Sequence, residues 1–263
     1  MTTFAPNLLA GKHAFITGGT RGINLSIAHR FARAGAKVTV IGRDAERAAN
    51  AQKQLEDAGA TALALSADVR DYAAVDGAIT KAVAAHGAID VLLCGAAGNF
   101  PAPAAVMSTN GFKAVVEIDL VGAFNACRAA FQHLTKPGAC VTFISANQAY
   151  VPAMLQAHVC AAKAGVDMMM KSLAMEWGGS GVRPNSIAPG PIADPEGMDR
   201  LASTPEAKKR AEKGIPLGRF GTKDEVAEVA LFLASPAAAY ITGAVIAMDG
   251  GFGLAGFGMN PLG

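Results

Sequence analysis

Apolar and polar residues along this chain form two patterns that take turns from one end to the other. Short, mostly apolar runs are typical of strands buried on both faces of a sheet. Between them, apolar residues recur every three or four positions, as on one face of a helix. The runs lie at residues 13–17, 37–41, 61–65, 89–94, 140–145, 182–188 and 244–248, and the helical patterns at 23–34, 45–58, 71–86, 112–131, 153–177 and 224–234.

Strands that alternate with helices predict a parallel sheet with helices on both faces. We expect an α/β protein with the three-layer Rossmann fold, a doubly wound parallel sheet of about seven strands. The whole chain, residues 1–263, has the length of one large domain. Ligands of such sheets bind at the carboxyl ends of the strands. A segment rich in proline, glycine and charge, around residues 191–222, predicts a lid over the substrate.

Composition narrows the class of protein. The net charge of +2 gives no reason to expect a nucleic-acid partner, and 51% apolar residues are ample for a core. The four cysteines lie far apart, without the spacing of a metal site, so we expect no metal and a reducing compartment. Residues 229–248 are uncharged, but Ser235-Pro236 and Thr242-Gly243 break them where a helix should end and a strand begin. We therefore expect a soluble protein without a membrane span.

The loop between the first strand and the first helix is the main candidate for cofactor binding. It reads Gly18-Gly19-Thr20-Arg21-Gly22-Ile23-Asn24. Backbone N–H groups at a helix start, and the positive end of the helix dipole, suit a pyrophosphate, and glycine leaves room for it. In this context the spacing predicts dinucleotide contacts from Gly18, Thr20, Arg21, Gly22 and Ile23.

The end of the second strand indicates which dinucleotide is bound. NAD enzymes generally place an acidic residue there for the ribose 2′-hydroxyl, whereas this chain has Gly42 and Arg43. Arg43 and Arg21 carry guanidinium groups, which pair well with a 2′-phosphate. The prediction is NADPH rather than NADH. The alternative is a pair of solvated surface arginines.

A resemblance to a known family rests on motifs spread over the whole chain. They are Thr17-Gly18-x-x-x-Gly22-Ile23, Ala67-Asp68-Val69, Ala96-Ala97-Gly98, the helix with Lys163, and Pro189-Gly190. In these motifs the chain resembles the short-chain dehydrogenase/reductase family. The resemblance implies adenine contacts from Asp68 and Val69, a cofactor contact from Gly98, a ribose contact from Lys163, and a carboxamide site at Pro189, Gly190 and Ile192.

The chain departs from this family at the residues that carry out chemistry. The family's alcohol and ketone chemistry uses Asn, Ser, Tyr and Lys. Aligned on Lys163, the Tyr place is Val159, the Ser place is Ala146 and the Asn place is Asp119. Neither valine nor alanine can donate a proton to an alkoxide, so simple carbonyl reduction is disfavoured. Asn24 replaces the family's third glycine, which puts close helix–strand packing there in doubt.

Further motifs indicate one branch of the family. Ala97-Gly98-Asn99-Phe100, Asp119 with Gly122 and Phe124, Gln156-x-His158, Glu176-Trp177-Gly178 and Ala188-Pro189-Gly190-Pro191-Ile192 resemble the 2,4-dienoyl-CoA reductases, above all the peroxisomal form. That form also lacks the tyrosine, and the resemblance implies that Asp119 and Lys163 are catalytic. The expected activity is NADPH-dependent reduction of 2,4-dienoyl-CoA to 3-enoyl-CoA, in the degradation of unsaturated fatty acids.

The chemistry of a dienoyl thioester fits these residues. Hydride adds at the far end of the conjugated system, and charge moves to the thioester oxygen as a dienolate that is protonated at carbon. A free aspartate is ionised at neutral pH, so we expect a water held by Asp119 and Lys163 to donate that proton. The alternative is an Asp119–Lys163 pair that only fastens two helices.

Substrate contacts are implied by the same resemblance. Cations at the mouth of a cleft suit an anionic CoA ligand, although each arginine alone is more often a surface charge. His158 could face the pocket, but a structural histidine with satisfied hydrogen bonds is the favoured interpretation. The implied contacts are Phe100 with the acyl chain, Ser108 and Asn110 with the thioester arm, and Arg70 and Arg200 with the CoA phosphates.

Two properties of the whole protein follow as expectations. Related proteins are usually tetramers, so we expect a homotetramer. The final residues, Asn260-Pro261-Leu262-Gly263, do not form a peroxisomal signal of the Ser-Lys-Leu type, so the cytoplasm is the expected location. Two alternative functions stay open: a short-chain reductase acting on another enone or acyl thioester, and a catalytically silent NADPH-binding protein.

Overall fold

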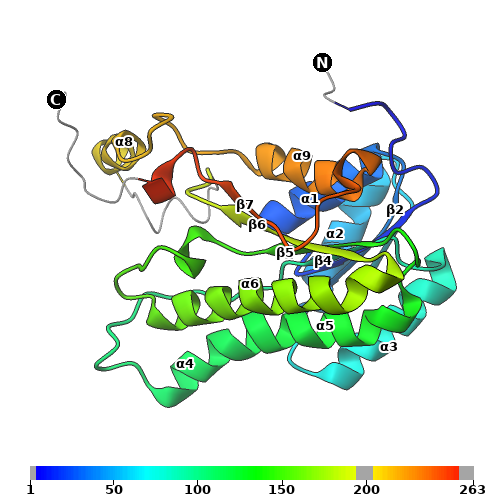
Figure 1. Cartoon of the computed structure of the whole chain (residues 1–263), viewed down its shortest axis with the longest axis horizontal. Coiled ribbons are helices and arrows are strands. Elements are labelled where there is room, and N and C mark those ends of the chain that lie inside the picture. Colours follow the sequence, from blue (N-terminus) through cyan, green and yellow to red (C-terminus); the bar gives the residue numbers. More distant parts are fainter. Residues whose placement is uncertain (1–3, 194–203, 255–263) are drawn as a thin grey trace.

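The computed structural model describes residues 4–193 and 204–254, which contain one parallel sheet of seven strands (Figure 1). The strands are β1 His13–Thr17, β2 Lys37–Gly42, β3 Ala62–Ser66, β4 Val91–Cys94, β5 Cys140–Ile144, β6 Arg183–Pro189 and β7 Val245–Met248. Their order in the sheet is β3-β2-β1-β4-β5-β6-β7, and every neighbouring pair is parallel. The order reverses between β1 and β4, so the predicted doubly wound Rossmann sheet is confirmed.

The described α-helices are α1 Gly22–Arg33, α2 Ala45–Asp57, α3 Tyr72–His86, α4 Thr109–Val116, α5 Gly122–Ala130, α6 Ala157–Trp177, α8 Pro205–Lys213 and α9 Lys223–Ala234. Some of them, α2, α3, α4 and α9, begin at a residue whose side chain caps the helix. Asp44 and Asp71 each accept a hydrogen bond from the backbone N–H three residues later. Within the described part of the chain, no helix combines the length and the apolarity needed to cross a membrane.

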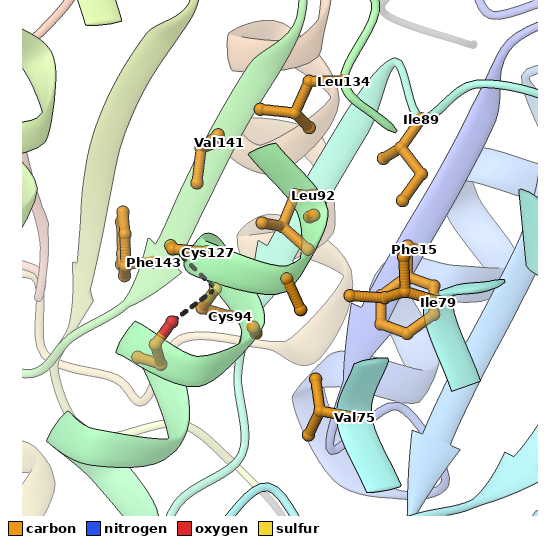
Figure 2. Close-up of a cluster of buried hydrophobic side chains, with 14 of the residues drawn as sticks. Phe15, Val75, Ile79, Ile89, Leu92, Cys94, Cys127, Leu134, Val141 and Phe143 are labelled. Atoms are coloured by element: carbon orange, nitrogen blue, oxygen red, sulfur yellow. Dashed lines mark hydrogen bonds between the residues drawn. The ribbon is translucent and has the colours of Figure 1, made fainter. Parts of the chain in front are cut away.

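Helices cover both faces of the sheet, with a hydrophobic core on each side. Figure 1 shows α3, α5 and α6 on one face and α1, α2 and α9 on the other. Phe15, Leu92 and Phe143 pack towards the first group; Figure 2 shows Leu92 and Phe143 near the free thiols Cys94 and Cys127, and Phe15 beside Ile79. Ile16, next to Phe15 on β1, packs towards the second group. Because successive residues point to opposite buried faces, the strands have the uninterrupted apolar runs of the sequence.

Two predicted helices differ from those observed. The pattern at residues 112–131 belongs to α4 and α5, which are joined by a π-helical turn, η1 (Glu117–Val121). Apolar periodicity continues through such a bulge, so the sequence did not indicate it. The helix predicted from residue 153 begins only at Ala157, because Leu155 has a φ of 64°. A right-handed helix cannot pass through that left-handed conformation.

The segment predicted as a lid is described only in part. Residues 194–203, and with them Arg200, lie outside the described residues. The remainder carries α8, and Ile192 forms an isolated parallel bridge with Gly221. The two ends of the segment therefore meet, and its action as a lid stays a prediction.

Candidate active site

A cleft with a volume of about 590 Å³ lies at the carboxyl ends of the strands, beside the reversal between β1 and β4. Doubly wound sheets bind their ligands at this position. The predicted cofactor residues that line the cleft are Gly18, Thr20, Arg21, Gly22, Ile23, Arg43, Asp68 and Val69. Asn24, Arg47 and Ile144 also line it, and sequence reasoning did not assign them to the cofactor.

The glycine loop presents backbone to the cleft. Gly18 and Gly22 have φ values of +67° and +60°, which side chains other than glycine rarely adopt. A Cβ on Gly18 would lie 2.8 Å from the Cα of Ala96. Because α1 starts at Gly22, its unpaired N–H groups and the positive end of its dipole lie at the cleft. The loop therefore has the construction that a pyrophosphate requires.

Asn24 holds this loop against the neighbouring strand. Its Nδ2 donates to the carbonyl oxygen of Gly95 at 2.7 Å and to that of Gly18 at 3.3 Å. A Cβ on Gly95 would lie 2.5 Å from the same nitrogen. Helix α1 and strand β4 therefore pack closely here, through Asn24 on the helix and Gly95 just after the strand. The replacement of the family's third glycine by Asn24 does not prevent this close packing.

Arginines gather at the end of the cleft near β2. Arg21 and Arg43 line it, and Arg47 joins them from the first turn of α2. Arg47 Nε lies 3.3 Å from Asp44 Oδ2 in a largely exposed pair, which contributes little stability. The sequence did contain a signal for Arg47. This residue lies four residues after Arg43, in the first turn of the helix that follows β2, and a side chain there can face the same site as Arg43.

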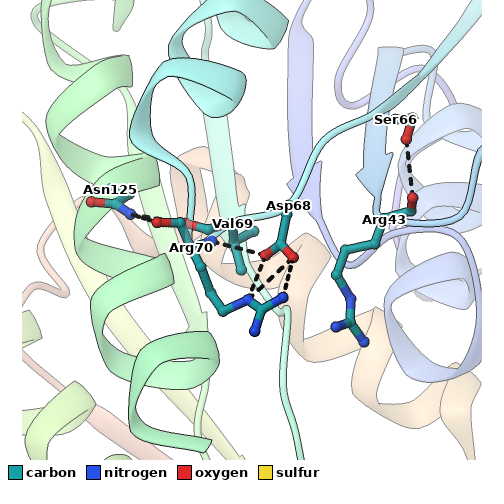
Figure 3. A network of polar contacts seen from close by, with 6 residues as sticks. All are labelled: Arg43, Ser66, Asp68, Val69, Arg70 and Asn125. Atoms are coloured by element: carbon teal, nitrogen blue, oxygen red, sulfur yellow. Dashed lines mark hydrogen bonds and ion pairs between the residues drawn. The ribbon is translucent and has the colours of Figure 1, made fainter. Parts of the chain in front are cut away.

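Asp68 and Arg70 form a bidentate ion pair at the edge of the cleft, shown in Figure 3. Arg70 Nη2 lies 2.6 Å and Nε 3.1 Å from Asp68 Oδ2. The hydrogen bond from Arg70 lowers the pKa of Asp68, and burial opposes this only in part. Val69 lies between Asp68 and Arg70, and Asn125 Nδ2 holds its backbone by donating to the Val69 carbonyl oxygen at 2.9 Å. A contact of Arg70 with CoA would compete with Asp68, and that role stays a prediction.

Asp119 and Lys163 form a buried ion pair beside the cleft. Lys163 Nζ lies 3.1 Å from Asp119 Oδ2, and the two side chains are 8% and 0% exposed respectively. Lys163 also donates to the carbonyl oxygen of Ile144, a residue of the cleft, at 2.9 Å. Asp119 Oδ1 accepts from the N–H of Gly98 at 2.7 Å. Asp119 Oδ2 is buried and accepts no aligned hydrogen bond from the described residues, so the Lys163 ammonium group 3.1 Å away is its charged neighbour.

Local backbone structure brings the two partners together. Asp119 lies in the π turn η1, and turns of this kind are frequent at functional sites. The next residue, Leu120, packs on α6 where Gly165 has no side chain. A Cβ on Gly165 would lie 2.8 Å from Leu120 Cδ2. The small residue therefore lets η1 approach α6 closely enough for the ion pair.

Apolar groups fill the places of the missing hydroxyls. Val159 is buried in a small cluster with Val115 and Ala162, between α6 and α4. Ala146 follows β5 and precedes a short 3-10 turn, η3 (Asn147–Ala149). Neither side chain can donate a proton, and this arrangement supports the argument against simple carbonyl reduction.

Several predicted substrate contacts lie near the start of α4 and α6. The Phe100 and His158 rings are 4.5 Å apart between centroids. His158 is fully buried, and neither ring nitrogen has a hydrogen-bond partner in the described part of the chain, so no protein hydrogen bond there supports its interpretation as a satisfied histidine. Ser108 Oγ caps α4 by accepting from the N–H of Gly111, and Asn110 is exposed in the first turn. Substrate contact by these residues stays a prediction.

The end of β6 is the segment expected to hold a nicotinamide carboxamide. Pro189 pairs with Met248 of β7, and the Gly190 N–H donates to the Met248 carbonyl oxygen at 3.0 Å. A Cβ on Gly190 would lie 2.5 Å from that of Asp249. Backbone contacts therefore hold this segment, with Ile192, at the carboxyl edge of the sheet.

Known proteins are similar to this chain over nearly its full length. A family model described as enoyl-(acyl carrier protein) reductase matches residues 18–253. A Rattus norvegicus protein named peroxisomal 2,4-dienoyl-CoA reductase, (3E)-enoyl-CoA-producing, is 43% identical over 94% of this chain and 86% of the rat protein. A Bacillus subtilis protein named probable 2,4-dienoyl-CoA reductase, (2E)-enoyl-CoA-producing, is 39% identical over 91% of this chain and 96% of its own length. The crystal structure of a dehydrogenase/reductase from Sinorhizobium meliloti 1021 has a TM-score of 0.86 and 33% identity, covering 92% of this chain and 95% of the other.

Proposed function

Because this chain belongs to the short-chain dehydrogenase/reductase family, we propose that it uses NADPH to reduce a 2,4-dienoyl-CoA to a 3-enoyl-CoA. The observation that carries the proposal is the buried Asp119–Lys163 pair beside the cleft, with apolar Val159 and Ala146 in the places of Tyr and Ser. Relatives named 2,4-dienoyl-CoA reductases support the same substrate class.

The residues of the cleft fit a nicotinamide dinucleotide phosphate. The glycine loop leaves room for the pyrophosphate, and Arg21, Arg43 and Arg47 suit the 2′-phosphate. When bound, this cofactor supplies a hydride. In the proposed mode Asp68 and Val69 contact the adenine, Gly98 lines the cofactor, Lys163 binds the nicotinamide ribose, and Pro189, Gly190 and Ile192 hold the carboxamide.

In the proposed reaction, the Asp119–Lys163 ion pair serves the protonation step. Hydride transfer to the far carbon of the diene moves negative charge to the thioester oxygen, where hydrogen-bond donors stabilise it. Lys163 has two contacts, to Ile144 and Asp119, and an ammonium group can make a third. A water held by Lys163 and Asp119 Oδ2 donates the proton to carbon, and the hydroxide that remains takes up a proton from solvent. The hydride and this proton together complete the reduction.

The substrate is placed on the α4 side of this pair. Phe100 contacts the acyl chain, and Ser108 and Asn110 lie near the thioester arm. Arg70 and Arg200 interact with the phosphates of CoA, for which Arg70 would have to exchange its partner Asp68.

The proposed product, a 3-enoyl-CoA, is the one in the name of the rat relative. The Bacillus subtilis relative is named instead for a (2E)-enoyl-CoA product. The test is to incubate the protein with NADPH and a 2,4-dienoyl-CoA, to follow both absorbances, and to identify the product by NMR. Turnover to the 3-enoyl thioester is expected. Turnover of other enones or simple ketones, but not of dienes, would support another short-chain reductase. Tight NADPH binding without any turnover would support a silent binding protein.

The assembly proposed for this protein is a homotetramer. Large apolar side chains lie exposed on the outer helices α5 and α6, including Phe124, Met168 and Met175. Exposed apolar groups of this kind are typical of subunit interfaces. The cytoplasmic location expected from the sequence stays a prediction.

A further inference from the structure

Behind Lys163, the sheet and α6 enclose polar side chains that take no part in the proposed reaction. Ser145, Ser186 and Asp167 are 3%, 0% and 6% exposed. Ser186 lies in register with Phe143 on β5, and Ser145, two residues after Phe143, points to the same face. Phe143 packs in the core cluster that contains residues of α6, so α6 covers that face.

Asp167, a residue of α6, lies near the two serines. It follows Lys163 by about one helical turn, so the two side chains lie on one face of the helix. Burial raises the pKa of Asp167, while the nearby hydroxyl groups of Ser186 and Ser145 and the charge of Lys163 oppose this rise in part. The carboxyl group therefore lies within electrostatic reach of both hydroxyls and of the ammonium group.

Three polar atoms in this group have no direct partner. Ser145 Oγ, Asp167 Oδ1 and Ser186 Oγ are all buried, and none of them is hydrogen-bonded to a residue that the structure describes. Buried polar atoms in proteins are nearly always satisfied, by protein groups or by ordered water. A buried water makes about three hydrogen bonds to otherwise unsatisfied groups, which matches the number of atoms here.

We propose that Ser145, Asp167 and Ser186 bind one internal water, and that this water site positions Lys163. The link is the backbone of β5, because Ser145 directly follows Ile144, whose carbonyl oxygen accepts from Lys163 Nζ. The Ser145 N–H donates to the carbonyl oxygen of Ile187, next to Ser186, at 2.8 Å. Holding the two serines therefore holds the acceptor that orients Lys163. The effect on catalysis rests on the proposed function, whereas the water site does not.

Crystallography of the full chain, at a resolution that shows ordered solvent, tests the water site. The expected result is a solvent peak within hydrogen-bond distance of all three atoms, displaced or lost in Ser186→Ala. Direct hydrogen bonds from the serines to Asp167, with no solvent peak between them, would overturn the proposal.

Kinetics with NADPH and a 2,4-dienoyl-CoA test the positioning role. Asp167→Asn and Ser145→Ala are expected to lower kcat roughly tenfold to a hundredfold, as small misplacements of a catalytic group do, with a smaller change in the KM for NADPH. Thr142→Val is the matched control, because Thr142 is buried on the same strand and, next to Phe143, faces the opposite side of the sheet.

A wild-type kcat in both variants, or an equal loss in Thr142→Val, would overturn the positioning role. Complete absence of diene turnover in the wild-type protein would instead remove the proposed function. The crystallographic result decides the water site in either case.

Discussion

Asp119 uses its two carboxylate oxygens for different purposes. Oδ1 accepts from the backbone of Gly98, and Oδ2 faces the ammonium group of Lys163. A buried ion pair contributes little net stability, but removing one partner leaves an unpaired buried charge and costs about 3–5 kcal/mol. The contact with Gly98 needs only an acceptor oxygen, whereas the contact with Lys163 needs the negative charge. A substitution that keeps shape and removes charge can therefore separate the two.

Asp119→Asn is expected to lower kcat for diene reduction by at least about a hundredfold, the usual contribution of a positioned acid–base group. The Kd for NADPH should stay close to the wild-type value, because an amide oxygen can still accept from Gly98. Steady-state kinetics and fluorescence titration measure the two quantities. Glu117→Gln is the matched control, an exposed acid in the same π turn. A wild-type kcat in Asp119→Asn would mean that the pair only fastens two helices.

The arginines near β2 provide a second test at the scale of residues. Arg43→Ala and Arg47→Ala should each raise the Kd for NADPH by about tenfold or more, because a hydrogen bond to a charged group contributes about 1.5–3 kcal/mol. The Kd for NADH, which lacks the 2′-phosphate, should change little. Arg33→Ala, an exposed arginine at the end of α1 and away from the cleft, is the control. Equal losses for both dinucleotides would remove the argument for NADPH.

Among the elements, the continuous unit of α4, η1 and α5 connects the two halves of the site. Figure 1 shows α4 and α5 in line with each other along one face of the molecule. The unit carries Asp119 in its π turn. At Gly122 it packs against Val69, a residue of the predicted adenine site. A Cβ on Gly122 would lie 2.6 Å from Val69 Cγ2 and 2.9 Å from Val69 Cβ, and the second of these atoms cannot move without the backbone.

Gly122→Ala should therefore lower the free energy of unfolding by about 1–2 kcal/mol through overpacking, and should weaken NADPH binding. Gly77→Ala is the matched control, because Gly77 is in the middle of α3 with nothing within 4 Å of an added Cβ. That control should stabilise the protein by about 0.5–1 kcal/mol, the helix propensity of alanine over glycine. Urea denaturation measures both. A stabilising effect of both substitutions would contradict the close approach at Val69.

The start of α9 gives a prediction that depends on pH. Thr222 and Glu225 form a capping box, and Arg219 Nη2 lies 2.6 Å from Glu225 Oε1. The hydrogen bond from Arg219, followed by that from the Thr222 backbone, lowers the pKa of Glu225 to about 2. Because the pKa is lowered on folding, the stabilisation is present above the unfolded pKa and is lost as pH falls towards 2.

Glu225→Gln should cost about 1 kcal/mol of unfolding free energy at pH 7, a value limited by the exposure of the pair. The difference from the wild-type protein should shrink between pH 4.5 and pH 2. Urea denaturation at several pH values measures it. Glu176→Gln, an exposed acid near the end of α6, should show a small difference throughout. A Glu225→Gln deficit that is independent of pH would contradict the role of the charge.

At the scale of the whole molecule, the outer surfaces of α5 and α6 bear on assembly. Phe124 is 48% and Met175 is 87% exposed, and both lie on helices that cover the same face of the sheet. A closed symmetric oligomer would remove such side chains from water.

Light scattering should therefore find a particle of four 26.7 kDa chains. The double variant Phe124→Glu with Met175→Glu should form smaller species, because charges are costly in the centre of an interface. Met154→Glu, an exposed apolar residue in the loop before α6, is the control and should keep the wild-type mass. A monomeric wild-type protein at micromolar concentration would contradict the tetramer.

Much of the molecule was predictable because the relevant patterns are local in the sequence. The apolar runs and helical periodicities indicated the order of strands and helices and hence the doubly wound sheet. The glycine spacing between β1 and α1 predicted residues that do line the cleft, namely Gly18, Thr20, Arg21, Gly22 and Ile23. Likewise, Val159 in the place of a tyrosine showed that the usual proton donor is absent, since a side chain's chemistry is set by its identity.

Only the tertiary structure decided how distant segments meet. It placed Asn24 against Gly95, brought the π turn with Asp119 to Lys163, paired Arg70 with Asp68, and left His158 buried without a partner in the described residues. It also gathered Ser145, Asp167 and Ser186 behind Lys163. These contacts depend on how closely the helices pack on the sheet and on where a helix contains a π-helical turn. Residues far apart in the chain jointly determine such distances, so no local pattern records them, whereas the order of elements and the chemistry of each side chain can be read from the sequence itself.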